Sequence, residues 1–490
     1  MNIAFRTDSS FSIGTGHIHR CLNIARKFKK KKTKCYFFTN DYPGNINKLI
    51  QEEFSLCKIS TKKRDGIYSD KDNIIDANAS IKLIRKHSID LLFLDNYLIN
   101  EKWEKKVSKY CKIVFISDFL NRKSFCDYYI NYNTPYESSF MSKNLDNKCK
   151  KLIGSDYSII KDLPNLKKKK LKKKITVFMG GVDTKNYTTQ LVNILSHKIF
   201  IDFKKIIVIG VKNKNAKILE NQVKNLNNFQ IINGNKKNLY SVFSNSKLVI
   251  TGVNTSMHEH LALGLNSIVI AQNKLQNKVI DNLSKLNLIN FIKYKRNITK
   301  YYIYSVLMRK NLSNKNRLLK KLFDSKGTHR IVEYFLSKNI TKKAELKKIS
   351  TEDKFFLFKL VNDPQVIKNS LTKRITNFNE HHRWFEKTKK KKNTNILIFK
   401  TINHKLGQVR FDKISKKKTF ITYSIANEFR GKNIGFKMLD MALKKNSYKT
   451  HLFAIVRKKN EASSKIFQKL GFSLLKEDRK RDLIYFSKSN

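Results

Sequence analysis

The chain has 490 residues with 102 Lys and Arg against 38 Asp and Glu, a formal net charge of +64, and its 40% hydrophobic content excludes a disordered polycation. Its length predicts several domains, and it contains no apolar window long enough for a membrane span or a signal peptide, so we expect a cytoplasmic protein without membrane insertion. The lysines form scattered runs without interleaved aromatic residues, which favours a biased composition over specific nucleic-acid binding, although the positive field would attract anionic small substrates.

Residues 1–162 alternate short apolar runs with helix-like stretches. We expect strands at residues 2–6, 34–39, 91–95 and 113–117, and helices at 17–29, 46–53, 77–86 and 101–110. Strand–helix alternation predicts a parallel α/β sheet. All six cysteines lie in this region and form no C-x-x-C pair, which indicates reduced, mostly buried thiols and no zinc site.

Two further regions follow. The lysine-rich residues 163–174 predict a linker, and residues 175–340 predict a second α/β domain. Its expected strands are 175–179, 205–209, 229–232, 247–250 and 267–270, with a long helix at 311–338. Residues 345–490 predict a third domain, with helices at 351–362 and 379–387, strands at 395–400, 407–411 and 419–425, and then a glycine turn, a helix, a strand and a last helix.

A glycine turn follows the first expected strand. Gly14 and Gly16 permit a tight turn, and the helix behind them offers free N–H groups and the positive end of its dipole, which suit a diphosphate. His17 stands at the start of this helix. A histidine there either exchanges a proton with water or a leaving group, or caps the helix, and the spacing alone leaves both roles open.

The motif RTDSSFSIGTGHIHRC at residues 6–21 resembles the opening of the nucleotide-sugar hydrolase of the pseudaminic acid pathway (PseG-like), a family with a GT-B-like fold of two Rossmann-like domains. Further matches follow in order: LDNY at 94–97, SDF at 117–119, CDYYINYN at 126–133, IGSDYSII at 153–160 and FMGGVD at 178–183. The resemblance covers residues 1–340. It implies that His17 is catalytic, that Asp8 orients His17 or binds a sugar hydroxyl, and that Gly14, Thr15 and Gly16 contact UDP.

The segment GVNTSMHEHLALG at residues 252–264 resembles the second phosphate-binding turn of the same family. The resemblance implies a UDP site formed by Asn254, Thr255, Ser256, Glu259 and Gln276. The turn N–H groups would hold the diphosphate, and Glu259 would accept hydrogen bonds from the ribose hydroxyls. Val253 and Asn254 replace glycines of the family pattern. Asn tolerates a positive φ more readily than Val does, so we expect the shape of the loop to change at Val253.

The hydrolase resemblance implies a reaction. Water activated by His17 attacks the anomeric carbon of UDP-2,4-diacetamido-2,4,6-trideoxy-β-L-altropyranose, and UDP leaves. The alternative is a GT-B glycosyltransferase fused to a GNAT domain that acts on a different amino sugar. The G-x-G-H sequence at the first turn favours the hydrolase.

The sequence RGKNIG at residues 430–435 resembles the pyrophosphate loop of GNAT acetyltransferases, in which successive N–H groups surround the coenzyme A pyrophosphate. The segment NEASSKIFQKLGF at 460–472 resembles the closing helix of that family. Together they imply acetyl-CoA binding by Arg430, Gly431, Lys432, Asn433, Ile434, Gly435 and Asn460. Asn433 replaces a glycine in a left-handed turn. Phe467 stands where many members carry a tyrosine proton donor, so the general acid is unassigned.

Two segments at the start of the third domain narrow the range of candidate substrates. NDPQVIKNS at residues 362–370 and NEHHRWFEK at 379–387 resemble the acetyltransferase of the preceding pathway step (PseH-like), which acetylates the 4-amino group of a UDP-amino sugar. His381 and Trp384 are candidates for contacting the sugar, although an amphipathic helix would also bury Trp384. We therefore expect an α/β protein of two Rossmann-like domains and a GNAT domain, bifunctional, using UDP-sugars and acetyl-CoA and no metal. The oligomeric state is left open.

Overall fold

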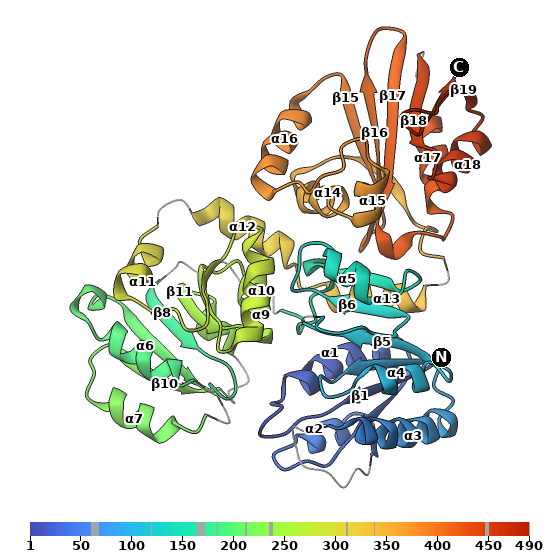
Figure 1. Cartoon of the computed structure of the whole chain (residues 1–490). Helices are drawn as coiled ribbons and strands as arrows, with labels where there is room; N and C mark the ends of the chain where they lie inside the picture. The colour runs from blue at the N-terminus through green and yellow to red at the C-terminus, as the bar shows by residue number, and fades with distance from the viewer. Residues whose placement is uncertain are drawn as a thin grey trace. The chain divides into compact units, whose positions relative to one another are not determined.

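The computed structural model describes residues 1–59, 68–118, 120–163, 172–183, 185–210, 213–234, 239–309, 312–337, 339–445 and 450–489. These residues form three sheets (Figure 1). The chain divides into two compact units, the first made of Met1–Pro135 and Lys143–Val332 and the second of Tyr136–Ser142 and Glu333–Asn490. The first unit contains two parallel sheets, and the second contains a mixed sheet.

The first sheet has seven parallel strands in the order β3-β2-β1-β4-β5-β6-β7. Its strands are β1 (Asn2–Thr7), β2 (Lys34–Thr39), β3 (Ser55–Lys58), β4 (Leu91–Asp95), β5 (Lys112–Ile116), β6 (Tyr128–Asn131) and β7 (Lys150–Ile153). Helices α1 (Gly16–Lys30), α2 (Asn47–Gln51), α3 (Asp70–Lys86), α4 (Glu101–Val107) and α5 (Ser139–Asn144) connect them. The central strands are almost wholly buried, as parallel strands covered on both faces require.

The second sheet has six parallel strands in the order β10-β9-β8-β11-β12-β13. Its strands are β8 (Lys172–Phe178), β9 (Lys204–Ile209), β10 (Phe229–Asn233), β11 (Ser246–Gly252), β12 (Ser267–Ile270) and β13 (Asn290–Ile292). The helices are α6 (Tyr187–Leu195), α7 (Ala216–Lys224), α8 (Leu239–Phe243), α9 (Thr255–Ala262), α10 (Lys274–Ser284), α11 (Lys300–Leu307), α12 (Leu312–Leu322) and α13 (Gly327–Leu336).

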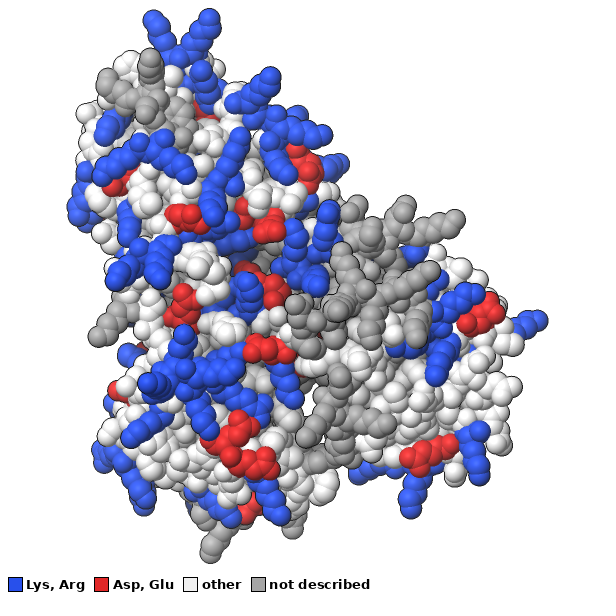
Figure 2. Space-filling view, turned by 180° about the vertical axis from the view of Figure 1, so that it is seen from behind, with Lys and Arg blue, Asp and Glu red and all other residues white. Residues whose placement is uncertain are grey.

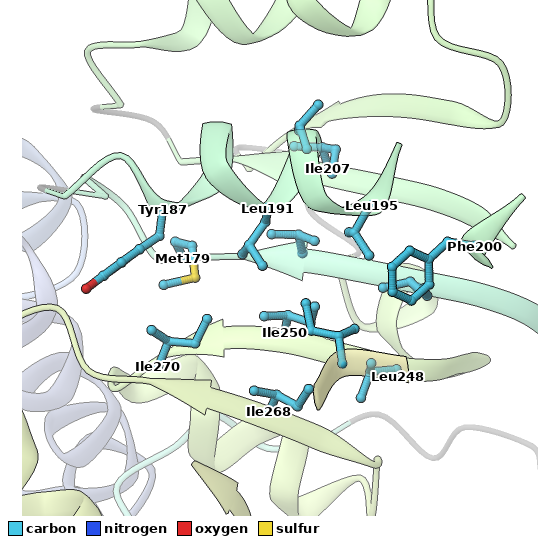
Figure 3. Packing of buried hydrophobic residues seen from close by; sticks show 14 of the residues in the cluster. Met179, Tyr187, Leu191, Leu195, Phe200, Ile207, Leu248, Ile250, Ile268 and Ile270 are labelled. Atoms are coloured by element: carbon cyan, nitrogen blue, oxygen red, sulfur yellow. The ribbon is translucent and has the colours of Figure 1, made fainter. Parts of the chain in front are cut away.

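The core of this second sheet lies between its strands and the apolar face of α6. Leu191 and Leu195 of α6 point toward Ile250 of β11 and Ile268 of β12 (Figure 3). Leu191 and Leu195 are four residues apart, the spacing that places two side chains on one face of a helix. All four residues are fully buried, so this packing fixes the position of the strands whose ends carry the predicted UDP residues.

Strand order reverses at equivalent places in the two sheets. β1 lies between β2 and β4, and β8 lies between β9 and β11. At such a switch point the loops after neighbouring strands diverge, which leaves a crevice at the carboxyl ends of the strands where ligands bind in open α/β sheets. The glycine turn predicted to bind phosphate follows β1, and the predicted UDP turn follows β11.

The third sheet has the order β14-β15-β16-β17-β18-β20-β19 and is antiparallel except for the β17–β18 pair. Its strands are β14 (Glu345–Lys348), β15 (Thr394–Lys400), β16 (Lys405–Lys413), β17 (Lys418–Ile425), β18 (His451–Arg457), β19 (Ser473–Asp478) and β20 (Leu483–Lys488). Its helices are α14 (Lys354–Val361), α15 (Pro364–Asn369), α16 (Phe378–Lys390), α17 (Ile434–Lys445) and α18 (Glu461–Lys469).

The structure corrects one expected element and leaves another outside the described residues. The helix expected at 311–338 is two helices, α12 and α13, because Ser325 adopts a left-handed φ of 60° between them and ends the first helical run. Most of the expected lysine linker, residues 164–171, lies outside the described part of the chain, and residues 172–174 already belong to β8.

The distribution of charge, the burial of the cysteines and the character of the helices can be compared with the expectations from the sequence. Lys and Arg side chains are spread over the face shown in Figure 2, with Asp and Glu among them. The expected burial of the thiols is confirmed, since Cys57 is the partly exposed exception among six free cysteines. Within the described ranges, no helix combines the length and the apolar character that crossing a membrane requires.

Candidate active sites

The turn after β1 places a histidine at the start of α1. Gly14 adopts a left-handed φ of 81°, which a residue with a side chain rarely does, and this lets the chain reverse before Thr15, the residue that precedes α1. His17 then lies in the first helical turn, with 11% of its side chain exposed. The predicted residues Gly14, Thr15, Gly16 and His17 are therefore contiguous at the carboxyl end of β1.

A buried carboxylate orients His17. Asp95, the last residue of β4, accepts a hydrogen bond from His17 Nδ1 at 2.6 Å. Arg20, one turn further along α1, donates to both oxygens of Asp95 at 2.7 and 3.0 Å. Burial opposes ionisation of Asp95, but the charge of Arg20 and the hydrogen bonds from Arg20 and His17 hold its pKa below the usual value. With the proton on Nδ1, the lone pair of His17 is on Nε2, the arrangement that a general base needs.

Asp8 does not take this position. Its carboxylate is fully buried beside Arg6 Nη1 at 2.8 Å and accepts from the backbone N–H of Asn40 at 2.7 Å and from Asn96 Nδ2 at 2.8 Å. These contacts tie the ends of neighbouring strands together. The expectation that Asp8 orients His17 is thus corrected, because β4 lies beside β1 in the sheet and presents Asp95 to the imidazole.

The structure adds two residues to this site that the motif reading did not single out. The ring of Tyr97 lies edge-on to the ring of His17, with 4.7 Å between centroids. The Tyr97 hydroxyl donates to Asp118, and Arg20 Nη1 also donates to Asp118, at 2.6 Å. Both residues lie in the segments LDNY and SDF, which match the hydrolase pattern. The sequence therefore indicated these positions but did not predict a role for them.

The turn after β11 needs no unusual backbone. Asn254 has a φ of −152°, and Val253 is absent from the positive-φ residues of the described chain, so the valine forces no left-handed strain. Asn254 caps α9 by accepting from Met257 N–H at 3.1 Å. Thr255 and Ser256 form the first turn of α9, where their N–H groups face the helix N-terminus. Val253 and Asn254 therefore form this turn without a left-handed conformation, and the comparison of the loop shape with the family pattern stays a prediction.

Glu259 and Gln276 have protein partners in this half of the unit. Tyr240 of α8 donates to Glu259 Oε1 at 3.2 Å, and burial raises the pKa of Glu259. Gln276 Nε2 donates to Val253 O at 3.1 Å, while its Oε1 accepts from the N–H of Gln272 at 2.7 Å. Gln276 therefore holds the turn through hydrogen bonds to backbone groups, and Glu259 shares Oε1 with Tyr240.

A direct polar contact joins the two halves of the first unit. His258 of α9 donates from Nε2 to Asn133 Oδ1 at 2.7 Å, and Asn133 Nδ2 donates to Asp118 at 2.8 Å. Since Asp118 also accepts from Arg20, a continuous set of hydrogen bonds runs from the helix of the UDP turn to the Asp95–His17 pair. Residues predicted in two separate sequence motifs thus belong to one hydrogen-bonded network.

In the second unit, the loop before α17 has the conformation expected of an anion-binding turn. Gly431 has a φ of 76° and Asn433 a φ of 56°, which confirms that Asn433 replaces a glycine in a left-handed turn. α17 begins at Ile434. At Gly435 an added Cβ would lie 3.0 Å from Ile466 Cδ1 and 3.4 Å from Tyr423 Cε2, so a larger residue would require these side chains to shift.

Three of the predicted acetyl-CoA residues, Arg430, Lys432 and Asn460, have side-chain partners. The Lys432 ammonium lies 4.4 Å from the centroid of the Tyr334 ring. Arg430 donates to Asp363 at 2.7 Å and to Gln365 at 3.0 Å, both on the segment that begins α15. Asn460 caps α18, accepting from Ser463 N–H at 3.4 Å. Arg430 therefore anchors the loop through its side chain, and the backbone N–H groups of the loop are left as its means of binding a pyrophosphate.

The sheet opens beside this loop. β17 pairs with β18 over Lys418–Phe420 and His451–Phe453, and beyond these residues each strand pairs on its other side alone, β17 with β16 and β18 with β20. The two neighbouring strands therefore part along their second halves. Phe467 of α18 is 2% exposed and packs on Tyr423, Phe472 and Phe486, so it fills the core and offers no hydroxyl.

The candidate sugar residues of α16 are placed differently from each other. His381 is 2% exposed and donates from Nε2 to the backbone oxygen of Lys354 at 2.9 Å, and burial lowers its pKa to about 4. This is a packing role, in place of the expected sugar contact. Trp384 is partly exposed, and the Arg410 guanidinium lies 5.7 Å from its ring. Among the residues described, no three His, Cys, Asp or Glu side chains are grouped to hold a metal ion.

Comparisons with known proteins divide the chain in the same way. Residues 343–473 match the acetyltransferase (GNAT) domain family. The UDP-2,4-diacetamido-2,4,6-trideoxy-beta-L-altropyranose hydrolase of Campylobacter jejuni is 26% identical over 290 residues, which cover 58% of this chain and 97% of that protein.

An uncharacterized protein of Methanocaldococcus jannaschii is 25% identical over 515 residues and 99% of both chains, so the similarity extends over both parts of this chain. The solved structure of a kitacinnamycin glycotransferase superposes with a TM-score of 0.51 at 12% identity, over 68% of this chain and 98% of that one, which shows a GT-B-like fold. The chain is thus a fusion of a GT-B-like region that resembles a PseG-like nucleotide-sugar hydrolase and a C-terminal GNAT acetyltransferase domain.

Proposed function

We propose that the chain catalyses two consecutive reactions on a UDP-sugar. The GNAT domain transfers an acetyl group from acetyl-CoA to the 4-amino group of a UDP-amino sugar. The GT-B-like region then hydrolyses the product, UDP-2,4-diacetamido-2,4,6-trideoxy-β-L-altropyranose, to UDP and the free sugar. Similarity to the Campylobacter jejuni hydrolase supports the choice of substrate. The match to the GNAT family supports the use of acetyl-CoA.

The observation that carries the hydrolytic proposal is the hydrogen bond between His17 Nδ1 and Asp95. It leaves Nε2 of His17 to accept a proton from water as the water oxygen attacks the anomeric carbon. The bond between that carbon and the phosphate oxygen breaks, and the diphosphate leaves carrying the oxygen. The helix N-terminus after Gly14 and the turn at Asn254 offer N–H groups for the negative charge that develops on the leaving group.

The acetylation proposal rests on the loop at Gly431–Gly435 and the parting of β17 from β18. The N–H groups of the loop would hold the pyrophosphate of coenzyme A. Among the described residues, β17 has no strand partner on that side after Phe420. The Ile425 oxygen accepts from Arg430 Nε at 3.0 Å, and the backbone groups nearer to Phe420 are offered to the amides of the pantetheine arm.

The test uses the purified full chain with acetyl-CoA and the UDP-4-amino sugar. We expect free UDP and free diacetamido sugar. His17→Ala is expected to stop UDP release and to leave acetylation unchanged, because His17 belongs to the first unit and the acetylation site to the second. Unchanged UDP release by His17→Ala would refute His17 as the base. UDP release that needs an added sugar acceptor would favour the glycosyltransferase alternative.

A further inference from the structure

Acetyl transfer requires a proton at a defined place. When the amine nitrogen attacks the thioester carbonyl, a C–N bond forms and the C–S bond breaks, so sulfur departs as a thiolate and nitrogen loses a proton. A nearby acid that protonates the sulfur speeds this step by about 10²–10⁴-fold. Phe467 has no hydroxyl, so the acid must come from another residue of this domain or from water.

Two hydroxyl groups meet at the open part of the sheet. Tyr423 of β17 and Ser463 of α18 form a hydrogen bond of 2.9 Å between Oη and Oγ. Tyr423 lies in the second half of β17, past Phe420, where β17 no longer pairs with β18. Its ring also borders Gly435, at the start of α17. The side chain therefore extends from the first turn of α17 to the first turn of α18 along the opening.

The position fits the thioester end of a bound acetyl-CoA. The unpaired edge of β17 runs from Ile425, close to the pyrophosphate loop, back to Ile421, which is about 13 Å at the usual rise of a strand. This distance is comparable with an extended pantetheine arm. Tyr423 lies about 7 Å from Ile425 along this edge. Because the loop lies beyond Ile425, a coenzyme A with its pyrophosphate on the loop would use the first part of its arm to reach the edge, and its sulfur would then lie beside Tyr423.

We propose that Tyr423 is the general acid of acetyl transfer and that Ser463 positions its hydroxyl. Tyr423 gives its proton to the sulfur as the C–S bond breaks, and Ser463 donates its own hydrogen bond to the phenolate that forms. Tyr423 then recovers a proton from water, and the proton lost by the amine also passes to water. The inference rests on the proposed acetyl transfer and adds the residue that supplies the proton.

The surroundings of Tyr423 agree with this role. Burial raises the pKa of Tyr423, while the hydrogen bond from Ser463 lowers it. The phenol therefore keeps its proton at neutral pH, and the Ser463 hydroxyl can donate a hydrogen bond to the phenolate when it forms. Ser463 and Phe467 are four residues apart on α18, so they share one face of the helix, and the Phe467 ring centroid lies 5.8 Å from that of Tyr423.

The experiment compares four variants of the full chain: Tyr423→Phe, Ser463→Ala, Phe467→Tyr and the double variant Tyr423→Phe/Phe467→Tyr. The reaction is followed by the loss of thioester absorbance with acetyl-CoA and the UDP-4-amino sugar. Tyr423→Phe is expected to lower kcat about 100-fold or more with KM for acetyl-CoA within about twofold, and to remove the alkaline limb of the kcat–pH profile. Ser463→Ala is expected to lower kcat less than Tyr423→Phe does, and to shift the alkaline limb to higher pH.

The double variant separates chemistry from packing. It moves the lost hydroxyl to the neighbouring ring, so we expect its kcat to be at least tenfold higher than that of Tyr423→Phe. Phe467→Tyr alone is expected to have a kcat near that of the wild type. Equal kcat and an unchanged alkaline limb in Tyr423→Phe would overturn the assignment. So would a Tyr423→Phe protein that has lost acetyl-CoA binding by titration and is not rescued. A wild-type chain that transfers no acetyl group would refute the proposed function itself.

Discussion

His17 acts as a base only if its proton is held on the nitrogen that faces away from the substrate. Asp95 provides this constraint through the 2.6 Å hydrogen bond to Nδ1, and Arg20 keeps Asp95 ionised. A carboxylate is required because an amide at the same position offers either an oxygen or an N–H to the ring and no charge. The pair therefore sets both the tautomer of His17 and the direction of its lone pair.

Replacing this carboxylate tests that account. We expect Asp95→Asn to lower kcat for UDP release by about 100-fold or more, because the amide no longer fixes the base form of His17. Steady-state UDP release measures the effect, and acetyl transfer by the same variant is the internal control.

Asp8→Asn is the matched comparison, since the Asp8 carboxylate is buried against Arg6, Asn40 and Asn96, whereas the partner of His17 is Asp95. Its expected effect is a lower thermal midpoint. A kcat loss in Asp8→Asn as large as that of Asp95→Asn, with an unchanged midpoint, would assign Asp8 a catalytic role instead.

The sequence motif located His17 but not its partner. Gly14, Gly16 and His17 are contiguous, so their proximity could be read directly. Asp95 lies 78 residues further along the chain, and only the pairing of β1 with β4 brings the two side chains together. The same reason explains the incorrect expectation for Asp8, which is close to His17 in sequence but points into the contacts between β1, β2 and β4.

At the scale of elements, apolar runs were reliable guides and short partly exposed strands were not. Strands β2, β4 and β12 have the expected bounds because each is a compact apolar run. Seven strands were missed: β3, β6, β7, β13, β14, β19 and β20. They have three to six residues each, and most of them lie at or next to the edge of a sheet. Their positions depend on the sheet edge that they join, which periodicity does not reveal.

The start of α17 offers an element-scale test of the coenzyme A loop. An added side chain at Gly435 meets Ile466 and Tyr423, so Gly435→Trp must push α17 away from the opening of the sheet. We expect loss of acetyl transfer and of acetyl-CoA binding by titration, with normal UDP release from the diacetamido substrate. Lys444→Trp, at the exposed end of the same helix, is the control and should stay active. Normal acetyl-CoA affinity in Gly435→Trp would place coenzyme A elsewhere.

Helix α9 predicts a pH effect on stability. Burial lowers the pKa of His258 to about 4 and that of His260 to about 3, and neither nitrogen of His260 has a hydrogen-bond partner. An unfolded histidine binds a proton near pH 6.5, so the unfolded state gains protons first as the pH falls. Stability is full above about pH 6.5 and falls by about 1.4 kcal/mol per pH unit for each histidine down to the folded pKa.

His260→Leu isolates one of these contributions. Its thermal midpoint should fall less than that of the wild type between pH 6.5 and 4.5, because the leucine takes up no proton. Thermal unfolding followed by circular dichroism across this range gives the comparison. Parallel curves for the two proteins would show that His260 is protonated equally well in the folded chain.

At the scale of the whole molecule, one chain joins two compact units, each with its own candidate site. The relative from Methanocaldococcus jannaschii is similar to this chain along its full length. In the proposed sequence the product of the GNAT domain is the substrate of the hydrolase, so the fusion raises the concentration of the intermediate near the second site. The charge of +64 adds a general attraction for both anionic substrates, UDP-sugar and acetyl-CoA.

The most direct test of two consecutive reactions is UDP release from the UDP-4-amino sugar with and without acetyl-CoA. The account predicts that the full chain releases UDP rapidly when acetyl-CoA is present and at least tenfold more slowly when it is absent, because the hydrolase acts on the acetylated product. Equal UDP release under the two conditions, or acetylation without any UDP release, would contradict it.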